Sequence, residues 1–430
     1  MSSGKGKTPF RIVVILPLLL LTIALASYFW ANFHGQDHSS GQSETNLEPP
    51  LLTPLPQTPE TKSKTAGLFP PALSSLGRLP DWSQLDRFQQ TITREEFLHR
   101  LDTIYSKNEG WKRWIATNDK LALINTGNTV YTLKFTSGPL RSPGAIFPFK
   151  KKSDLISFKS HRLTGLHIAI DPGHIGGDFA KIEERNLRYG DHEPIQEGTM
   201  TLLTSTHLKA LLEDLGAQVT LVRKTTTPVT SLRPRDFTGR DQKSAEKLFY
   251  RSAEIRARAD LINQSIQPDL VLCLHFNASG SPVPLAGQNF HIILNGAYHP
   301  TEISHQDERF EMLQHLLAGT ISEELPLAKK IAEIFVSQTG LPAYEYRPNH
   351  PYATKLAPYV WGRNLLANRL YQCPVIFMEP YTMNSTDFIA RHKAGDYEGQ
   401  RLVDGKMRLS VYREYAKALA DGVAAYYRKQ

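Results

Sequence analysis

The sequence predicts an α/β domain over residues 160–430, with a mostly parallel sheet that helices flank on both faces. One observation is that continuous apolar runs recur along this part without polar alternation, as expected of strands covered on both sides. Another is that the segments between the runs carry apolar residues at helical spacing. Upstream of this domain, the sequence predicts a transmembrane helix, a linker and a small α+β module.

Residues 1–32 are predicted to form a short cytoplasmic tail and a transmembrane anchor. The run from Ile12 to Ala31 has no charged residue and is about as long as the ~20 residues that cross a bilayer as a helix. Three basic residues precede it, Lys5, Lys7 and Arg11. By the positive-inside rule we expect a single-pass protein of the cytoplasmic membrane, with the α/β domain outside, in the periplasm. An Ala-Leu-Ala sequence at residues 24–26 leaves signal-peptidase cleavage open, but the aromatic residues 28–30 favour an uncleaved anchor.

Residues 33–88 are predicted to be a linker, and residues 89–150 a small α+β module. The linker is rich in Ser, Thr, Gln and Pro, with eight prolines between Pro49 and Pro80, and buries too little apolar surface to fold. The module begins with a capping box at Thr93 and continues with apolar residues at helical spacing and short strand-like runs. The module could bind a partner or the cell wall, or it could only pack against the rest of the chain, and the sequence is equally compatible with both roles.

The strands of the α/β domain are the apolar runs that end at Ile170, Val222, Phe276, Leu294 and Glu379. Residues 200–215 form a helix between the first two runs, because they keep one apolar face and Gly216 stands where a helix C-cap belongs. Residues 327–335 keep another such face ahead of Gly340. Functional groups of this fold gather beyond the carboxyl ends of the strands, which is where candidate site residues should be sought.

Composition excludes some classes of protein. The two cysteines, Cys273 and Cys373, cannot build a disulfide framework or a cysteine zinc cluster, and both are expected to be buried thiols, although one bridge between them is open. Lys and Arg outnumber Asp and Glu by 50 to 42, a surplus that suits an anionic envelope but is also ordinary for a solvated surface. We expect no nucleic-acid partner.

Four polar residues stand where this fold places its chemistry. His174 ends an Asp-Pro-Gly-His turn after the first strand, Glu197 precedes an apolar helix, and His275 and Glu379 close two further strands. Two imidazoles and one carboxylate form a His₂Glu set, which is typical of catalytic zinc. Glu379 is then a candidate to accept a proton from the attacking water. The alternative for each residue alone is a hydrogen-bonded structural role, so the joint pattern carries the hypothesis.

The sequence resembles the zinc-dependent N-acetylmuramoyl-L-alanine amidases of the type-3 family. The resemblance rests on ordered motifs over about 260 residues: IDPGH ending at His174, QEGTMTLL at Glu197, GAQVTLVR ending at Arg223, Arg258, DLVLCLHFNA around His275 and CPVIFMEP at Glu379. It implies a fold like that of zinc amidases and exopeptidases. It also implies that His174, Glu197 and His275 bind Zn²⁺, that Glu379 is the catalytic carboxylate, and that the substrate is peptidoglycan, cut between N-acetylmuramic acid and L-alanine.

The segment between His174 and Glu197 is a departure from the family. Glu197 stands 23 positions after His174, a longer step than the family leads us to expect, and the segment between them contains other candidate ligands: Glu183, Glu184, Asp191, His192 and Glu193. Glu197 is preferred because it alone opens a helix. Two other functions stay open: a zinc peptidoglycan peptidase or carboxypeptidase, and a non-catalytic wall-binding protein on an amidase fold.

A helix is predicted over residues 307–318, because Phe310, Leu313, Leu316 and Leu317 share one face and Gly319 follows. Some members of the resembled family carry a helix here that covers the zinc site until a partner, an activator protein, removes it. The candidate plugging carboxylates are Glu302, Glu308 and Glu311. The alternative is a helix that only packs on the domain.

Overall fold

The computed structural model describes residues 72–138, 149–155, 162–189, 193–281 and 283–428. The predicted anchor at residues 1–32 and most of the predicted linker lie outside these ranges.

The predicted location as a single-pass membrane protein is wrong on this structure. No helix in the described ranges is long and apolar enough to cross a bilayer. The longest of them, α8 (Ile321–Thr339), carries five Lys or Glu residues, and a helix that spans a bilayer tolerates few such charges. The segment from Ile12 to Ala31, on which the prediction rested, is not among the described residues.

The large sheet has seven strands in the order β10-β11-β9-β12-β8-β4-β7. Their bounds are β4 His167–Pro172, β7 Gln218–Leu221, β8 Leu270–Leu274, β9 Phe290–Leu294, β10 Thr354–Ala357, β11 Val360–Gly362 and β12 Val375–Pro380. Strands β12, β8, β4 and β7 are parallel, and β11 is parallel to β9, so the sheet is mostly parallel, as predicted.

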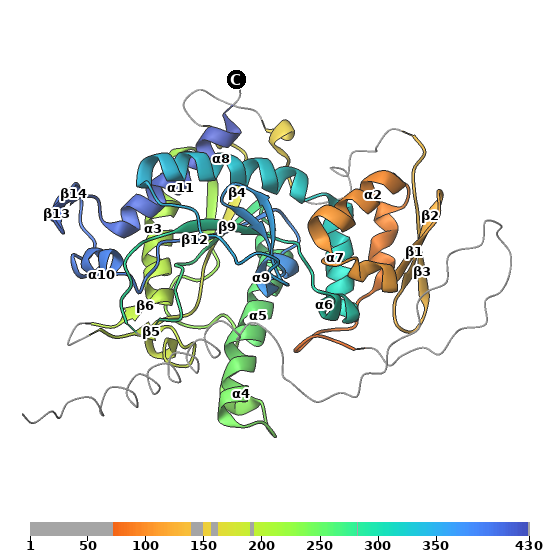
Figure 1. Ribbon diagram of the computed structural model, residues 1–430, viewed down its shortest axis with the longest axis horizontal. Coiled ribbons are helices and arrows are strands. Elements are labelled where there is room, and N and C mark those ends of the chain that lie inside the picture. Colours follow the sequence, from red (N-terminus) through yellow and green to blue (C-terminus); the bar gives the residue numbers. More distant parts are fainter. Residues whose placement is uncertain (1–71, 139–148, 156–161, 190–192, 282, 429–430) are drawn as a thin grey trace, which may run out of the picture.

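Helices cover both faces of this sheet, which confirms the predicted α/β architecture (Figure 1). On one face, Ile168 and Ile170 of β4 share a core with residues of α3 (Glu197–Asp214), α8 and α11 (Val411–Tyr427). On the other face, Ala169 shares a core with residues of α5 (Glu254–Leu261), α7 (Gln306–Ala318) and α9 (Leu366–Leu370). Alternate residues of one strand thus enter two cores, which is why the run shows no polar alternation.

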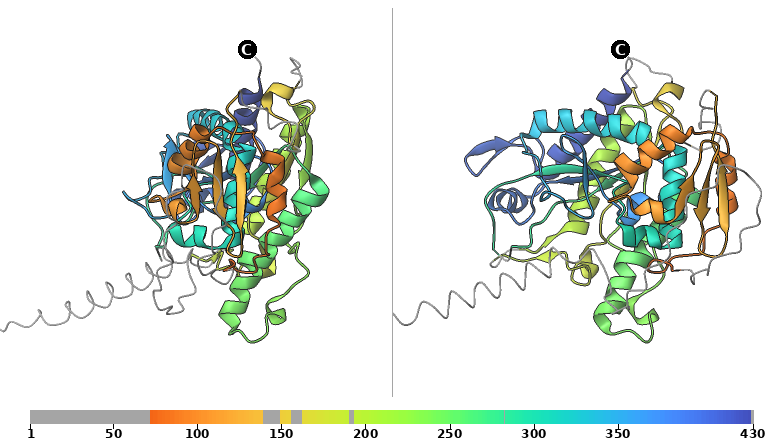
Figure 2. Two further views of the ribbon diagram at one scale, coloured as in Figure 1. Left: turned by 90° about the vertical axis from the view of Figure 1, so that its right-hand side faces the viewer. Right: turned by 45° about the vertical axis from the view of Figure 1, so that its right-hand side comes forward.

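The remaining elements are short or peripheral. They are β5 Asn186–Leu187, β6 Ile195–Gln196, α4 Gln242–Lys247, α6 Pro300–Ser304, α10 Thr386–Lys393, β13 Arg401–Val403 and β14 Lys406–Arg408. Figure 2 shows α4 at the end of a long rod that runs on into α5 and extends beyond the rest of the described chain. Both cysteines are free and buried, as expected of apolar thiols, so the bridge left open does not form.

Strand β9 runs antiparallel to its neighbour β12. The apolar run that ends at Leu294 was predicted to be one of the strands whose carboxyl ends carry functional groups. Because β9 is reversed, its beginning lies at the edge of the sheet where β12 ends. This strand therefore contributes His291, and not residues after Leu294, to the neighbourhood of Glu379, with which His291 is paired in register.

The N-terminal module is α+β, as predicted, but its first residues are not linker. Helix α2 (Arg94–Arg100) precedes the three-stranded antiparallel sheet β1 Ile115–Thr117, β2 Leu121–Asn125 and β3 Val130–Lys134. Residues 82–88, which were expected within the linker, form a 3-10 helix in which Leu85 and Phe88 are fully buried. They join the apolar core that also contains α7, so burial of two large side chains orders this segment.

Helix α7 confirms the predicted helix but not its covering role. Twelve of its thirteen residues are buried, and it lies between the N-terminal elements and the large sheet (Figure 1). Glu308 and Glu311 form ion pairs with Arg369 at 2.7 and 2.6 Å, and Glu302 accepts the backbone N–H of His299 at 2.7 Å. The three proposed plugging carboxylates are thus engaged with other groups, and the helix packs two parts of the chain together.

A buried carboxylate at the amino end of β12 makes stability depend on pH. Glu324 of α8 is fully buried and accepts the backbone N–H of Val375 at 3.0 Å. Burial raises its pKa to about 8, against an ordinary value of 4.5. Because the folded state holds the proton more tightly than the unfolded chain, stability is complete below pH 4.5 and falls as pH rises toward 8.

Glu324→Gln should therefore stabilise the protein at pH 9, by roughly a few kcal/mol, and change little at pH 5. The amide keeps an acceptor for Val375 and removes the charge. Urea unfolding at the two pH values measures the difference. Glu333→Gln, at an exposed position of the same helix, is the matched control and should leave the pH dependence unchanged. An equal pH dependence in Glu324→Gln and the unaltered protein would contradict the assignment.

Candidate functional site

The four predicted site residues come together at one edge of the sheet. His174 follows β4, His275 follows β8, Glu379 lies in β12, and Glu197 is the first residue of α3. Strands β4, β8 and β12 are adjacent and parallel, so their carboxyl ends meet at this edge. Residues separated by up to 205 positions thus become neighbours.

Glu197 lies between the two histidines. Its Oε2 is 3.1 Å from His174 Nε2, and its Oε1 is 3.0 Å from His275 Nδ1. The backbone N–H of Phe276 donates to Oε1 at 3.1 Å, and Arg185 Nε pairs with Oε2 at 3.1 Å. One nitrogen of each imidazole and one oxygen of Glu197 all lie within 4.8 Å of one another. This donor set fits a zinc ion, which binds imidazole nitrogen and carboxylate oxygen.

The charges of this cluster are strongly coupled. Burial would lower the pKa of His174, but the carboxylates of Glu197 and Glu183 raise it to about 9. Burial lowers the pKa of His275 below its usual range. Burial would raise the pKa of Glu197, but the two histidines hold it well below the ordinary value. The carboxylate thus stays ionised, as a metal ligand must be, whereas a metal would require both histidines to be neutral.

Glu183 supports His174 from the other side. Its carboxylate accepts the backbone N–H groups of Ile175 and Gly176 at 2.8 to 3.0 Å, and its Oε1 is 3.4 Å from His174 Nδ1. A carboxylate on the second ring nitrogen is the usual partner of a metal-binding histidine. Glu183 therefore orients His174, and it does not displace Glu197 from the group that lies between the histidines.

The other candidates in the long segment lie elsewhere. Glu184 is near Arg251, at 3.7 Å, and Glu193 is exposed. Asp191 and His192 are outside the described residues. From the sequence, Glu183 was expected only as a competing ligand, and no role was expected for Arg185. The unusual length of the segment was the signal that it supplies additional site residues.

A buried arginine holds the Asp-Pro-Gly-His turn. His174 has a φ of +55°, a left-handed conformation that is rare for residues other than glycine. Arg258 Nη2 donates to the carbonyl of His174 at 2.8 Å, and Nη1 donates to Asp171 Oδ1 at 2.9 Å. Arg258 is only 1% exposed, and Glu254 completes its pairing at 2.8 Å. The strained turn is therefore fixed by charge-assisted hydrogen bonds.

A second buried arginine joins this turn to α3. Arg223 Nε donates to the carbonyl of Pro172 at 3.1 Å, and Nη2 donates to the carbonyls of Gly173 and Gly198 at 3.1 and 2.6 Å. Gly198 follows Glu197 in the first turn of α3. Arg223 and Arg258 were part of the sequence motif without an assigned role, and the structure shows that both position the backbone of the candidate ligands.

Glu379 is the last residue but one of β12, and it lies beside the cluster. Burial, followed by the negative charge of Glu197, raises its pKa to about 8. Two residues earlier in β12, the ring of Phe377 stacks on His275 with centroids 4.3 Å apart and so fixes the plane of that imidazole. A partly buried carboxyl group with a pKa near neutrality can both accept and donate a proton, as a general acid–base group must.

Residues 168–399 match the family model described as N-acetylmuramoyl-L-alanine amidase. No curated protein matches the chain.

Several solved structures are similar to part of the chain. The amidase Ami1 of Mycobacterium smegmatis is 17% identical, with 62% of this chain and 98% of that chain covered and a TM-score of 0.36. CwlD of Clostridioides difficile in complex with the GerS lipoprotein is 14% identical, with 61% and 98% covered and a TM-score of 0.39. AmiC2 of Nostoc punctiforme is 14% identical, with 61% and 98% covered and a TM-score of 0.37.

Proposed function

The chain belongs to the N-acetylmuramoyl-L-alanine amidase family, and from this premise we propose that His174, Glu197 and His275 hold the zinc ion with which it hydrolyses peptidoglycan. As a member of this family the chain is a hydrolase that acts on peptidoglycan. The bond cleaved is the amide between the lactyl group of N-acetylmuramic acid and L-alanine. The observation that carries the zinc proposal is the grouping of two imidazole nitrogens and one carboxylate oxygen within 4.8 Å.

When bound, zinc supplies Lewis acidity that polarises the scissile carbonyl and makes water a better nucleophile at neutral pH. Glu379 takes a proton from the attacking water, and its carboxyl then passes a proton to the nitrogen of L-alanine as the carbon–nitrogen bond breaks. Glu183 keeps His174 in orientation, and Phe377 does the same for His275.

The buried arginines serve this mechanism indirectly. Arg223 and Arg258 hold the carbonyls of the turn that carries His174 and of the first turn of α3. They therefore set the distance between two proposed ligands on separate elements, which is the kind of support that a precise metal site requires.

Product analysis tests the proposed bond. The full chain, loaded with zinc, is incubated with intact sacculi, and the new termini are identified. We expect a free amino group on L-alanine and a free lactyl carboxyl group on the muramic acid. New termini within the peptide would instead indicate the alternative peptidase, and the absence of any release would favour the non-catalytic wall-binding alternative. Dependence on an activator protein stays a prediction.

A further inference from the structure

Asp171 of β4 carries a charge into an apolar core. It is paired in register with Cys273 of β8 and lies on the same face of β4 as Ala169, and both of these residues belong to the core that α5, α7 and α9 cover. Asp171 is only 3% exposed. A carboxylate this deeply buried is costly unless hydrogen bonds and an opposite charge compensate it. Its two oxygens therefore need partners from the elements that cover this face.

Two side chains supply these partners. Arg258 of α5 donates from Nη1 to Asp171 Oδ1 at 2.9 Å, and the hydroxyl of Tyr371 donates to Asp171 Oδ2 at 2.6 Å. Tyr371 stands 200 positions after Asp171 in the chain and is fully buried. A hydroxyl that donates to a carboxylate forms a short, charge-assisted hydrogen bond. The tyrosine thus fixes one oxygen of the carboxylate while the arginine holds the other.

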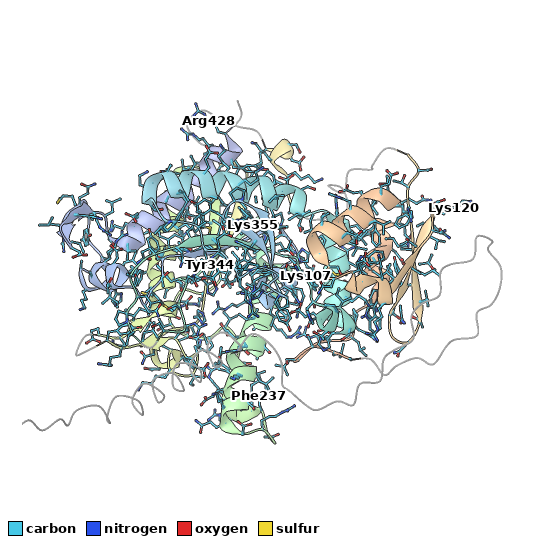
Figure 3. All side chains as sticks on the ribbon, viewed as in Figure 1. Lys107, Lys120, Phe237, Tyr344, Lys355 and Arg428 are labelled. Carbon is cyan, nitrogen blue, oxygen red and sulfur yellow. The ribbon has the colours of Figure 1, made fainter. Side chains whose placement is uncertain are left out.

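The backbone on both sides of Tyr371 is also held. Tyr371 directly follows α9, and the side chain of Asn263, in the helical turn after α5, bridges its two neighbours. Asn263 Nδ2 donates to the carbonyl of Leu370 at 2.8 Å, and its Oδ1 accepts the N–H of Gln372 at 2.9 Å. Side chains fill the space between the large sheet and its covering helices (Figure 3), and the ring of Tyr371 belongs to the core on this face. The hydroxyl is therefore presented to Asp171 from a fixed support.

The effect of this hydroxyl reaches a proposed zinc ligand through Arg258. The guanidinium that Asp171 holds at Nη1 donates from Nη2 to the carbonyl of His174 at 2.8 Å. His174 is the residue with a φ of +55°, a conformation that persists in a residue other than glycine only where the surrounding structure enforces it. Tyr371, Asp171 and Arg258 thus form one continuous chain of hydrogen bonds that ends on the strained residue.

We propose that Tyr371 is a positioning residue of the zinc site and that, through its chain of hydrogen bonds to Arg258, it keeps His174 where it can bind the metal. This inference rests on the proposed zinc ligands and adds a residue that acts on them through two intervening side chains. Loss of an outer partner of a metal ligand lowers metal affinity by about 10- to 100-fold. Because two side chains stand between Tyr371 and His174, we expect a loss near the lower end of that range.

Tyr371→Phe tests the proposal, because it keeps the ring and removes only the hydroxyl. The full chain is prepared without metal, and its zinc affinity is measured by competition with a chelator under conditions in which urea unfolding shows the protein to be folded. We expect the dissociation constant for zinc to rise about 10-fold. A hydroxyl that only stabilised the fold would increase resistance to urea without affecting the zinc affinity of the folded protein. An unchanged zinc affinity in Tyr371→Phe would therefore overturn the proposal.

Tyr397→Phe is the matched control, because Tyr397 is also buried and its hydroxyl donates to the carbonyl of Arg408 in β14 at 3.1 Å. This variant should bind zinc as tightly as the unaltered protein does. A fall in affinity equal to that of Tyr371→Phe would show that the effect is not specific to the hydrogen-bond chain, and it would also overturn the proposal.

Asp171→Asn tests whether the hydroxyl acts through the carboxylate. The double variant, Tyr371→Phe together with Asp171→Asn, should bind zinc no more weakly than Asp171→Asn alone, because both changes break the same chain of hydrogen bonds. Losses of affinity that multiply in the double variant would contradict the route through Asp171. If the unaltered protein binds no zinc, the proposed ligand set itself fails, and the inference with it. Zinc binding that Tyr371→Phe leaves unchanged removes this inference alone.

Discussion

Glu379→Gln should lower the rate of the chemical step by about 10²–10⁴-fold, the range that a general acid–base group contributes. The amide keeps the size of the carboxyl group, but it cannot take a proton from water or return one to the leaving nitrogen. Because Glu379 is outside the proposed ligand set, zinc content and substrate affinity should stay close to those of the unaltered protein. Single-turnover rates on a muramoyl peptide, together with elemental analysis, measure the two effects separately.

The control for this variant is Glu345→Gln, which makes the same chemical change at an exposed glutamate that pairs with Lys355. It should cleave at the normal rate. Turnover of Glu379→Gln within a few-fold of normal would remove Glu379 from the mechanism. A rate loss that accompanies loss of zinc would show that the residue holds the metal and does not transfer protons.

His174→Ala and His275→Ala should each lose zinc and, with it, activity. Each variant removes one of three proposed ligands and leaves the carboxylate of Glu197 without one of the two rings that lie about 3 Å from its oxygens. The two remaining ligands cannot hold the ion at submicromolar free zinc, since structural and catalytic sites use at least three protein ligands. Zinc per chain, measured by elemental analysis after dialysis, should fall from one to near zero in both variants.

Two further variants make this test specific. Glu183→Gln weakens the support of His174 without removing a ligand, so zinc affinity should fall by only about 10–100-fold. His207→Ala changes a histidine that pairs with Asp396 at 3.0 Å, away from the site, and should retain zinc in full. Full occupancy in both His174→Ala and His275→Ala would reject the ligand set.

Most of the central fold was predictable because its signals are local. Apolar runs such as the one that ends at Ile170 show strands covered on both faces, and both cores around β4 confirm it. Helix α7 was also predictable from its apolar face and from Gly319, which takes the left-handed C-cap with a φ of +70°. The role of that helix was not predictable, because the residue that pairs with Glu308 and Glu311 is Arg369 on α9, more than 50 positions along the chain.

The order of residues along the chain is enough to show which side chains stand at the strand ends, and hence that the residues to examine are His174, Glu197, His275 and Glu379. These are properties of a residue and its immediate neighbours, which a single chain displays directly. The direction of β9, the support of His174 by Glu183, and the link that Arg223 makes between the turn and α3 become visible only in the folded chain. Strand direction and side-chain contacts depend on packing between segments far apart in the chain, and no local pattern records which of those segments meet.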